Sequence, residues 1–273
     1  MTPLDVVNKP QIMEYNMPTW KAISKTEHAN KHFIARKGYS FAAKQQVVPV
    51  LLAELSKLIP LYAIGFIYQQ DAYIPVVLTG IGGEQNLFVN ADGKWIGSYV
   101  PAVLRGYPFA LADNMGEKVL CIQEDHLVDD SQGEPLFDSE GNLTKPVQET
   151  LNFLNECEKN RRVTQTASTA LDKAGVIEKW PLQIKQQEGQ EPVQVDGLYR
   201  ISENALNELD AETFAGLRSN GALALAYAQL FSMNQINQLA ERAKYHARQQ
   251  SKPEEPDIEK LFGNDDILSF DNI

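Results

Sequence analysis

The sequence predicts an α+β protein in which an antiparallel, sheet-rich N-terminal half packs with a helix-rich C-terminal half. Short segments rich in β-branched and aromatic residues, joined by turn residues, fill much of the chain up to residue 127 and are typical of antiparallel strands. From about residue 145 onward, apolar residues recur at helical spacing over longer segments. The chain has 273 residues, 43% of them apolar, which suits one large domain or two closely packed ones.

The predicted domain organisation has three parts. Residues 1–20 are expected to be irregular, because Pro3, Pro10 and Pro18 interrupt continuous secondary structure. Residues 21–250 are expected to form the α+β domain, either as one unit or as two intimate halves at about 21–127 and 142–250. Residues 251–273 are acidic and punctuated by proline, so they are expected to form a loose tail.

In the N-terminal half, Ser24 is expected to cap a short turn before residues 28–35. A buried helix is expected over residues 48–57. Strands are expected at residues 61–68, 74–79, 86–90, 95–99 and 118–123. The third and fourth of these strands are expected to pair through a turn at residues 90–93, because Asp and Gly accept positive φ angles.

In the C-terminal half, a long helix is expected over residues 145–174, ended by Gly175. Residues 182–187 and 193–201 are expected to form a hairpin around residues 188–192. Ser202 is expected to cap a short helix that reaches residue 209. Two further helices are expected at residues 211–219 and 222–246.

Composition argues against several classes of partner. The formal net charge is −11 and the longest basic run is Arg161-Arg162, so neither nucleic acid nor an anionic membrane surface is an expected partner. Two cysteines in no metal-binding pattern do not suggest a disulfide scaffold. Without a signal peptide or an apolar run of about 20 residues, a soluble cytoplasmic protein is expected, although export by a C-terminal signal stays open.

Motifs with known chemistry are missing from the sequence. It has no nucleophile elbow, P-loop or GxGxxG fingerprint, and the glycines at residues 80–83 are interpreted as a flexible turn. His28 and His32 share a face if both lie on a helix, but Ala29 replaces the glutamate that an HExxH zinc site needs. The acidic turns are interpreted as ordinary turns. We therefore expect no metal, no cofactor and no recognisable catalytic residue, which favours a protein that is not an enzyme.

The stretch from residue 86 to residue 109 is the best candidate for a binding site. Its aromatic residues and single arginine are Phe88, Trp95, Tyr99, Arg105, Tyr107 and Phe109. Trp, Tyr and Arg dominate binding hot spots, and an arginine can clamp a carboxylate. The same residues can equally form the edge of a core, with Arg105 bound to loop carbonyls. Sequence alone slightly favours this structural interpretation.

Several motifs together resemble the bacterial SapC-like family. These are NLFVNADGKW, YVPAVLRGYPFAL, GEPLFDSEGNLT and, late in the chain, GLYRISENALNEL and GALALAYAQLFSMNQINQL. The resemblance extends from about His28 to about Leu239. It implies a link to paracrystalline surface layers, but the family has no established catalytic residues to transfer.

Three hypotheses of function follow. The favoured one is a non-catalytic binding or accessory protein for a protein or peptide partner linked to the cell surface or its transport. A second is an enzyme of unfamiliar type, in which Arg105 fixes an anionic substrate and Tyr99, Tyr107 or Asp92 transfers protons. A third is a component of the surface layer itself. The sequence gives no indication of the oligomeric state.

Overall fold

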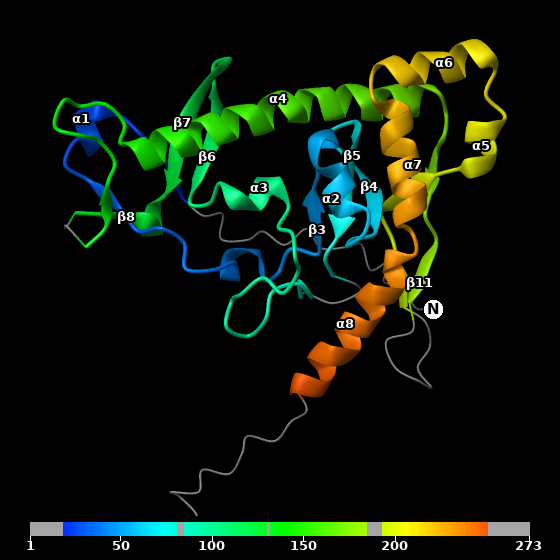
Figure 1. Ribbon diagram of the computed structural model, residues 1–273, viewed down its shortest axis with the longest axis horizontal. Helices are drawn as coiled ribbons and strands as arrows, with labels where there is room; N and C mark the ends of the chain where they lie inside the picture. The colour runs from blue at the N-terminus through cyan, green and yellow to red at the C-terminus, as the bar shows by residue number, and fades with distance from the viewer. Residues whose placement is uncertain (1–18, 81–84, 130–131, 185–192, 251–273) are drawn as a thin grey trace, which may run out of the picture.

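The computed structural model describes residues 19–80, 85–129, 132–184 and 193–250 (Figure 1). The expected tail at 251–273, the turn at 188–192 and most of the glycine cluster lie outside the described residues. So does the segment predicted to be irregular, except for its last two residues, of which Trp20 begins a strand.

A five-stranded antiparallel sheet forms the centre of the molecule, in the order β10-β13-β4-β5-β3. Its strands are β3 (Val47–Pro49), β4 (Ile64–Gln69), β5 (Ala72–Leu78), β10 (Ile177–Lys179) and β13 (Leu198–Ile201). The β4–β5 hairpin turns through Gln70 and Asp71, whose φ angles of 51° and 57° match the twist of paired strands. The sheet therefore joins strands from both halves of the chain.

Three smaller sheets surround it. One has the order β1-β7-β6, a second β8-β2-β9, and β11 pairs with β12 in the third. Their strands are β1 (Trp20–Ala22), β2 (His32–Phe33), β6 (Phe109–Asn114), β7 (Glu117–Gln123), β8 (Leu127–Val128), β9 (Glu134–Pro135), β11 (Leu182–Ile184) and β12 (Val193–Val195).

The longer helices belong to the C-terminal half. They are α4 (Lys145–Lys173), α5 (Glu203–Asn207), α6 (Ala211–Ser219), α7 (Ala222–Ser232) and α8 (Gln235–Gln250). Shorter turns of helix occur earlier, at α1 (Lys25–His28), η1 (Ser40–Ala42), η2 (Leu52–Glu54), α2 (Leu55–Leu58), α3 (Ala102–Arg105) and η3 (Glu124–His126). This arrangement confirms the predicted α+β class.

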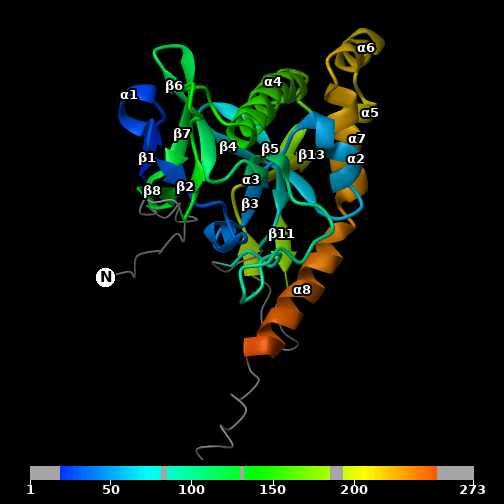
Figure 2. The same cartoon turned by 60° about the vertical axis from the view of Figure 1, so that its left-hand side comes forward.

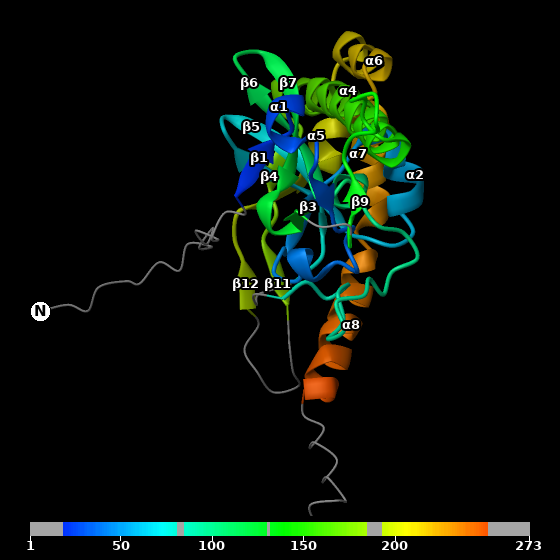
Figure 3. The same cartoon turned by 90° about the vertical axis from the view of Figure 1, so that its left-hand side faces the viewer.

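Helix α4 spans the molecule from the β6–β7 hairpin to α7 (Figures 1 and 2). Near its start, Val147 belongs to a core that also contains Phe33 and Phe109. Near its end, Leu171 belongs to a larger core between the central sheet and α7. One helix therefore contributes to both cores. Helix α8 and the β11–β12 hairpin project from the same end of the molecule (Figure 3).

Predictions based on strong local patterns are confirmed. The strands at 61–68, 74–79 and 118–123 exist as β4, β5 and β7, and the helix at 145–174 exists as α4. Gly175 follows α4 with φ +69°, a left-handed conformation that glycine adopts without strain. Ser202 caps α5 by accepting a hydrogen bond from the Ala205 amide. The strand pairing expected around 188–192 exists as β11 and β12, while β13 joins the central sheet.

Other predictions are wrong where distant contacts override local preference. Ser24 does cap a short turn, α1, but a helix that would align His28 with His32 does not form, because Phe33 lies in the second core and β2 pairs with β8 and β9. The helix expected at 48–57 is replaced by the end of β3 and two short turns, because Val48 and Pro49 pair with β5 in the central sheet. The helix expected at 222–246 is divided into α7 and α8. Strand β6 and helix α3 were not anticipated.

The two strands expected at 86–90 and 95–99 are also wrong, because only Val89 and Trp95 pair, in one isolated bridge. Hydrogen bonds from side chains hold this segment where backbone pairing between two strands was expected. The side-chain nitrogen of Asn86 donates to the Ala42 carbonyl, and its side-chain oxygen accepts from the backbone amide of Phe88. The turn at 90–93 does form, with the Gly93 amide bound to the Asn90 carbonyl.

Two buried polar side chains on α7 bind the backbone of the central sheet. The Gln229 oxygen accepts from the Ile201 amide at 2.9 Å, and its nitrogen donates to the Ile64 carbonyl at 3.3 Å. Ser232 Oγ accepts from the Ile64 amide at 2.9 Å. These groups lie just beyond the β4–β13 pairing, so α7 supplies hydrogen bonds that a longer pair of strands would make.

Replacing Gln229→Leu is expected to lower the free energy of unfolding by about 2–5 kcal/mol, because it leaves two buried backbone groups without partners. Urea denaturation measures the change. Gln235→Leu is the control, since the shielded Gln235 side-chain oxygen has no hydrogen-bond partner in the described part of the chain. Equal stabilities of the two variants would contradict this role for Gln229.

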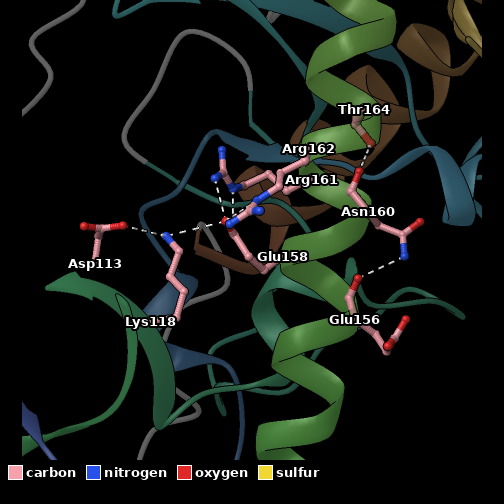
Figure 4. A network of polar contacts seen from close by, with 8 residues as sticks. All are labelled: Asp113, Lys118, Glu156, Glu158, Asn160, Arg161, Arg162 and Thr164. Atoms are coloured by element: carbon pink, nitrogen blue, oxygen red, sulfur yellow. Dashed lines mark hydrogen bonds and ion pairs between the residues drawn. The ribbon is translucent and has the colours of Figure 1, made fainter. Parts of the chain in front are cut away.

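Ion pairs join the β6–β7 hairpin to α4 (Figure 4). Glu158 on α4 accepts a two-pronged contact from Arg161, at 2.7 and 2.8 Å, and a further contact from Arg162. Lys118 on β7 lies 3.5 Å from the same carboxylate and 3.6 Å from Asp113. Hydrogen bonding from Arg161, the largest cause, and the neighbouring charges lower the pKa of Glu158 from 4.5 to about 2.

A lowered folded-state pKa gives stability that is present above pH 4.5 and lost as the pH falls toward 2. We therefore expect Glu158→Gln to destabilise the protein near neutral pH, with the deficit shrinking below pH 4.5. Urea denaturation across pH 3–7 tests this. Glu149→Gln is the control, because Glu149 forms an exposed pair on the same helix. A deficit independent of pH would exclude the electrostatic explanation.

Candidate functional site

The six predicted binding residues do not share one surface. Phe88 is 2% exposed and lies in the larger core, where it stacks on Trp95 and packs against Tyr62. Phe109 is 5% exposed and lies in the second core, edge to face with Phe33 at 4.9 Å. These two phenylalanines are therefore shielded from any partner of the folded protein.

Tyr107 has surroundings of its own. Its ring stacks on Phe41, with centroids 3.9 Å apart, and meets the rings of Trp20 and His126 edge to face. Burial raises the pKa of its hydroxyl above the ordinary value. No contact recorded among the described residues joins Tyr107 to Tyr99 or to the Arg105 guanidinium.

Tyr99 and Arg105 do meet. Arg105, at the end of α3, is exposed, and its guanidinium lies 5.5 Å from the centre of the Tyr99 ring and 5.0 Å from that of Phe153 on α4. Its Nη2 donates to the Tyr99 hydroxyl at 3.4 Å. Among the described residues, no carboxylate forms an ion pair with Arg105. The guanidinium is thus held against two rings and has no direct ion-pair partner among the described residues.

Glu54 completes this group and was missed by sequence reasoning. It is 4% exposed and accepts hydrogen bonds from the Leu51 amide at 2.9 Å, the Ala102 amide at 2.8 Å and the Tyr99 hydroxyl at 3.1 Å. Burial raises the pKa of Glu54, while these hydrogen bonds and the charge of Arg105 oppose the rise. The only signal in the sequence was a single carboxylate within the apolar segment at residues 47–55.

The backbone at Tyr99 is held from the other side. The Tyr62 hydroxyl donates to the Tyr99 carbonyl, and the Trp95 indole donates to that carbonyl and to the Tyr62 oxygen, at 3.1 Å each. Tyr62 is 1% exposed, and burial raises the pKa of its hydroxyl well above the ordinary value. Tyr99 is therefore fixed at both ends, by Glu54 at its hydroxyl and by this pair at its carbonyl.

Cys157 on α4 lies near the same group. Burial raises the pKa of its thiol, and the charge of Arg105 only partly opposes this. A raised pKa disfavours the thiolate that nucleophilic catalysis needs. The chemistry that this arrangement offers is therefore a fixed cation at the surface, above a buried acid whose oxygens already accept hydrogen bonds.

A cavity lies elsewhere, between the segment at residues 85–93 and α8. Its volume is about 560 Å³, and its lining includes Gln85, Asn90, Tyr245 and His246 but neither Tyr99 nor Arg105. His246 is fixed there by the Leu87 carbonyl and the Gln85 side chain. Asp92, at the turn, is exposed.

The expected helical histidine pair does not form. His28 ends α1, while His32 belongs to β2, so no single helix face contains both. Within residues 19–80, 85–129, 132–184 and 193–250, no three His, Cys, Asp or Glu side chains are grouped to hold a metal ion.

Comparison with known proteins gives one match. The model of the SapC family matches residues 23–239 of the chain. No curated protein and no solved structure matches. In the described part of the chain, no helix is long and apolar enough to cross a membrane.

The raised pKa of Glu54 has a consequence for stability. A carboxyl whose folded-state pKa exceeds its ordinary 4.5 binds protons more tightly in the folded state, so its contribution to stability falls as the pH rises above 4.5. We expect the free energy of unfolding of the wild type, relative to Glu54→Gln, to decrease over that window. Urea denaturation from pH 4.5 to 7 measures it, with exposed Glu203→Gln as control. A flat difference would contradict the assignment.

Proposed function

The chain belongs to the SapC family, and we propose that it is a non-catalytic binding or accessory protein that holds a protein or peptide partner at the surface around Arg105. The observation that supports this proposal is the exposed guanidinium of Arg105, which is held against the rings of Tyr99 and Phe153 and forms no direct ion pair among the described residues. Arginine is one of the residue types that most often contribute a large share of the binding free energy at protein interfaces.

A guanidinium that is ordered before the partner arrives lowers the entropic cost of binding. A flexible arginine loses rotamer freedom when a partner fixes it, whereas Arg105 is already ordered by two rings and by the Tyr99 hydroxyl. Arg105 therefore offers a partner a charge whose position is already set.

The identity and place of the partner are part of the proposal. The family resemblance supports a partner linked to the cell surface or to its transport, with the protein itself in the cytoplasm. Cell fractionation tests the location. Recovery from the surface fraction would instead favour the hypothesis that the protein is a component of the surface layer.

One observation favours an enzyme as the second candidate. Glu54 has a raised pKa and binds the hydroxyl of Tyr99 beside Arg105, a combination suited to proton transfer near an anionic substrate. Two further groups in that hypothesis do not join the site: Tyr107 packs against Phe41, and Asp92 lies at the turn next to the cavity-lining residues. The binding function therefore has the stronger support.

Arg105→Ala is expected to reduce recovery of partner proteins at least about tenfold in affinity pull-downs, since a hot-spot side chain contributes more than about 1.4 kcal/mol. Thermal unfolding should change little, because Arg105 is exposed. Arg218→Ala is the matched control: Arg218 is also exposed and makes no ion pair among the described residues. An unchanged set of partners in the folded Arg105→Ala protein would contradict the proposal.

A further inference from the structure

We propose that Arg36 and Arg105 together bind an acidic peptide segment of the partner, in an extended conformation and with carboxylates two residues apart. This inference rests on the proposed binding function and names the chemistry that the surface recognises. It begins from a contact between the two arginines: Nη2 of Arg36 donates to the backbone carbonyl of Arg105 at 3.4 Å.

That contact limits the distance between the two positive charges. Adding the reach of the Arg105 side chain to the 3.4 Å contact keeps the two guanidinium groups within roughly 13 Å of each other. Salt screens much of the repulsion between exposed charges about one Debye length apart, and an anion placed near both is attracted by each.

The chain has many carboxylates that could neutralise the charges of Arg36 and Arg105. It contains 36 acidic and 25 basic residues, and the arginines at 161, 162 and 200 all form ion pairs. In the described part of the chain, neither Arg36 nor Arg105 does. Glu54 is buried, which raises its pKa against the opposing charge of Arg105, and it accepts three hydrogen bonds from its own surroundings.

Arg36 also has a hydrogen-bond donor that is unpaired in the described part of the chain. Its Nε is shielded from solvent and has no hydrogen-bond partner among the described residues. An unpaired shielded donor on a charged group lowers stability, and a ligand at the surface does not reach this atom. A carboxylate would therefore meet Arg36 through the Nη side of the guanidinium, where the planar fork of arginine matches two oxygens.

Both guanidinium groups rest on one connected set of rings. Arg36 lies 4.7 Å from the centre of the Tyr39 ring, and Tyr39 meets Trp95 edge to face at 5.6 Å. Trp95 in turn donates to the Tyr99 carbonyl, and the Tyr99 ring supports Arg105. The spacing of the two charges is therefore set by packed aromatic side chains, which favours a ligand with two charges at a fixed separation.

An extended peptide provides that separation. Residues i and i+2 of a strand point to the same side, about 7 Å apart, which lies within the limit for the two guanidinium groups. Each arginine also stands two residues after an exposed aliphatic side chain, Ile34 at 38% and Val103 at 44%. Apolar neighbours of this kind suit peptide side chains better than an isolated inorganic anion.

Fluorescence polarisation with a labelled hexapeptide tests the inference. The probe has glutamate at alternate positions, and its counterpart has glutamine there. We expect the wild type to bind the glutamate peptide at least about tenfold more tightly than the glutamine peptide. Arg36→Gln and Arg105→Gln should each remove most of that preference, the double variant all of it, and Arg218→Gln none. Arg36→Lys keeps the charge without the fork and should retain an intermediate preference.

The possible failures are distinguishable. Equal affinity for the two peptides, or an equal loss in Arg218→Gln, would overturn the inference. Complete displacement of the glutamate peptide by an equal concentration of inorganic phosphate would also overturn it, in favour of a general anion site. If Arg105→Ala still abolishes partner recovery while Arg36→Gln leaves it unchanged, the proposed function stands and only the acidic-peptide site fails.

Discussion

The hydrogen bonds of Glu54 are the constraint on which the candidate site depends. One buried carboxylate accepts from the amides of Leu51 and Ala102 and from the Tyr99 hydroxyl. It thereby joins the turn before α2 to the loop that leads into α3. Burying a charge is costly, and the raised pKa shows that these hydrogen bonds do not fully offset the cost. The Glu54 carboxylate fixes the position of the Tyr99 ring, against which Arg105 packs.

Helix α4 connects Glu54 and its neighbours to the rest of the fold. Thr164 on α4 accepts a hydrogen bond from the Leu52 amide at 2.9 Å, two residues before Glu54. Ser168, one turn later, donates to the Tyr73 carbonyl of β5 at 2.7 Å. Phe153 on the same helix forms the second ring beside Arg105. A single long helix thus ties the central sheet, the turn containing Glu54 and the guanidinium of Arg105 to one another.

Sequence patterns predicted the elements whose structure is decided locally. The helical spacing over 29 residues identified α4, and the apolar segments on either side of Gln70 and Asp71 identified β4 and β5. Prediction failed where backbone groups bind distant partners, as at Asn86, whose side chain replaces a strand ladder. Glu54 could not be identified because its donors Tyr99 and Ala102 lie 45 and 48 residues away, and no local pattern reports such contacts.

The stretch from residue 86 to residue 109 posed a choice between a core edge and a binding site for a partner, and the geometry assigns its residues unequally to the two. Phe88 and Phe109 are buried, and Trp95 binds the Tyr99 carbonyl from within. Arg105 alone among the six predicted residues is exposed. A cation at the surface binds with less entropic cost when packed rings fix its position beforehand. The buried aromatic residues therefore belong to the interior, and the proposed contact with a partner depends on Arg105 and the rings of Tyr99 and Phe153 that hold it.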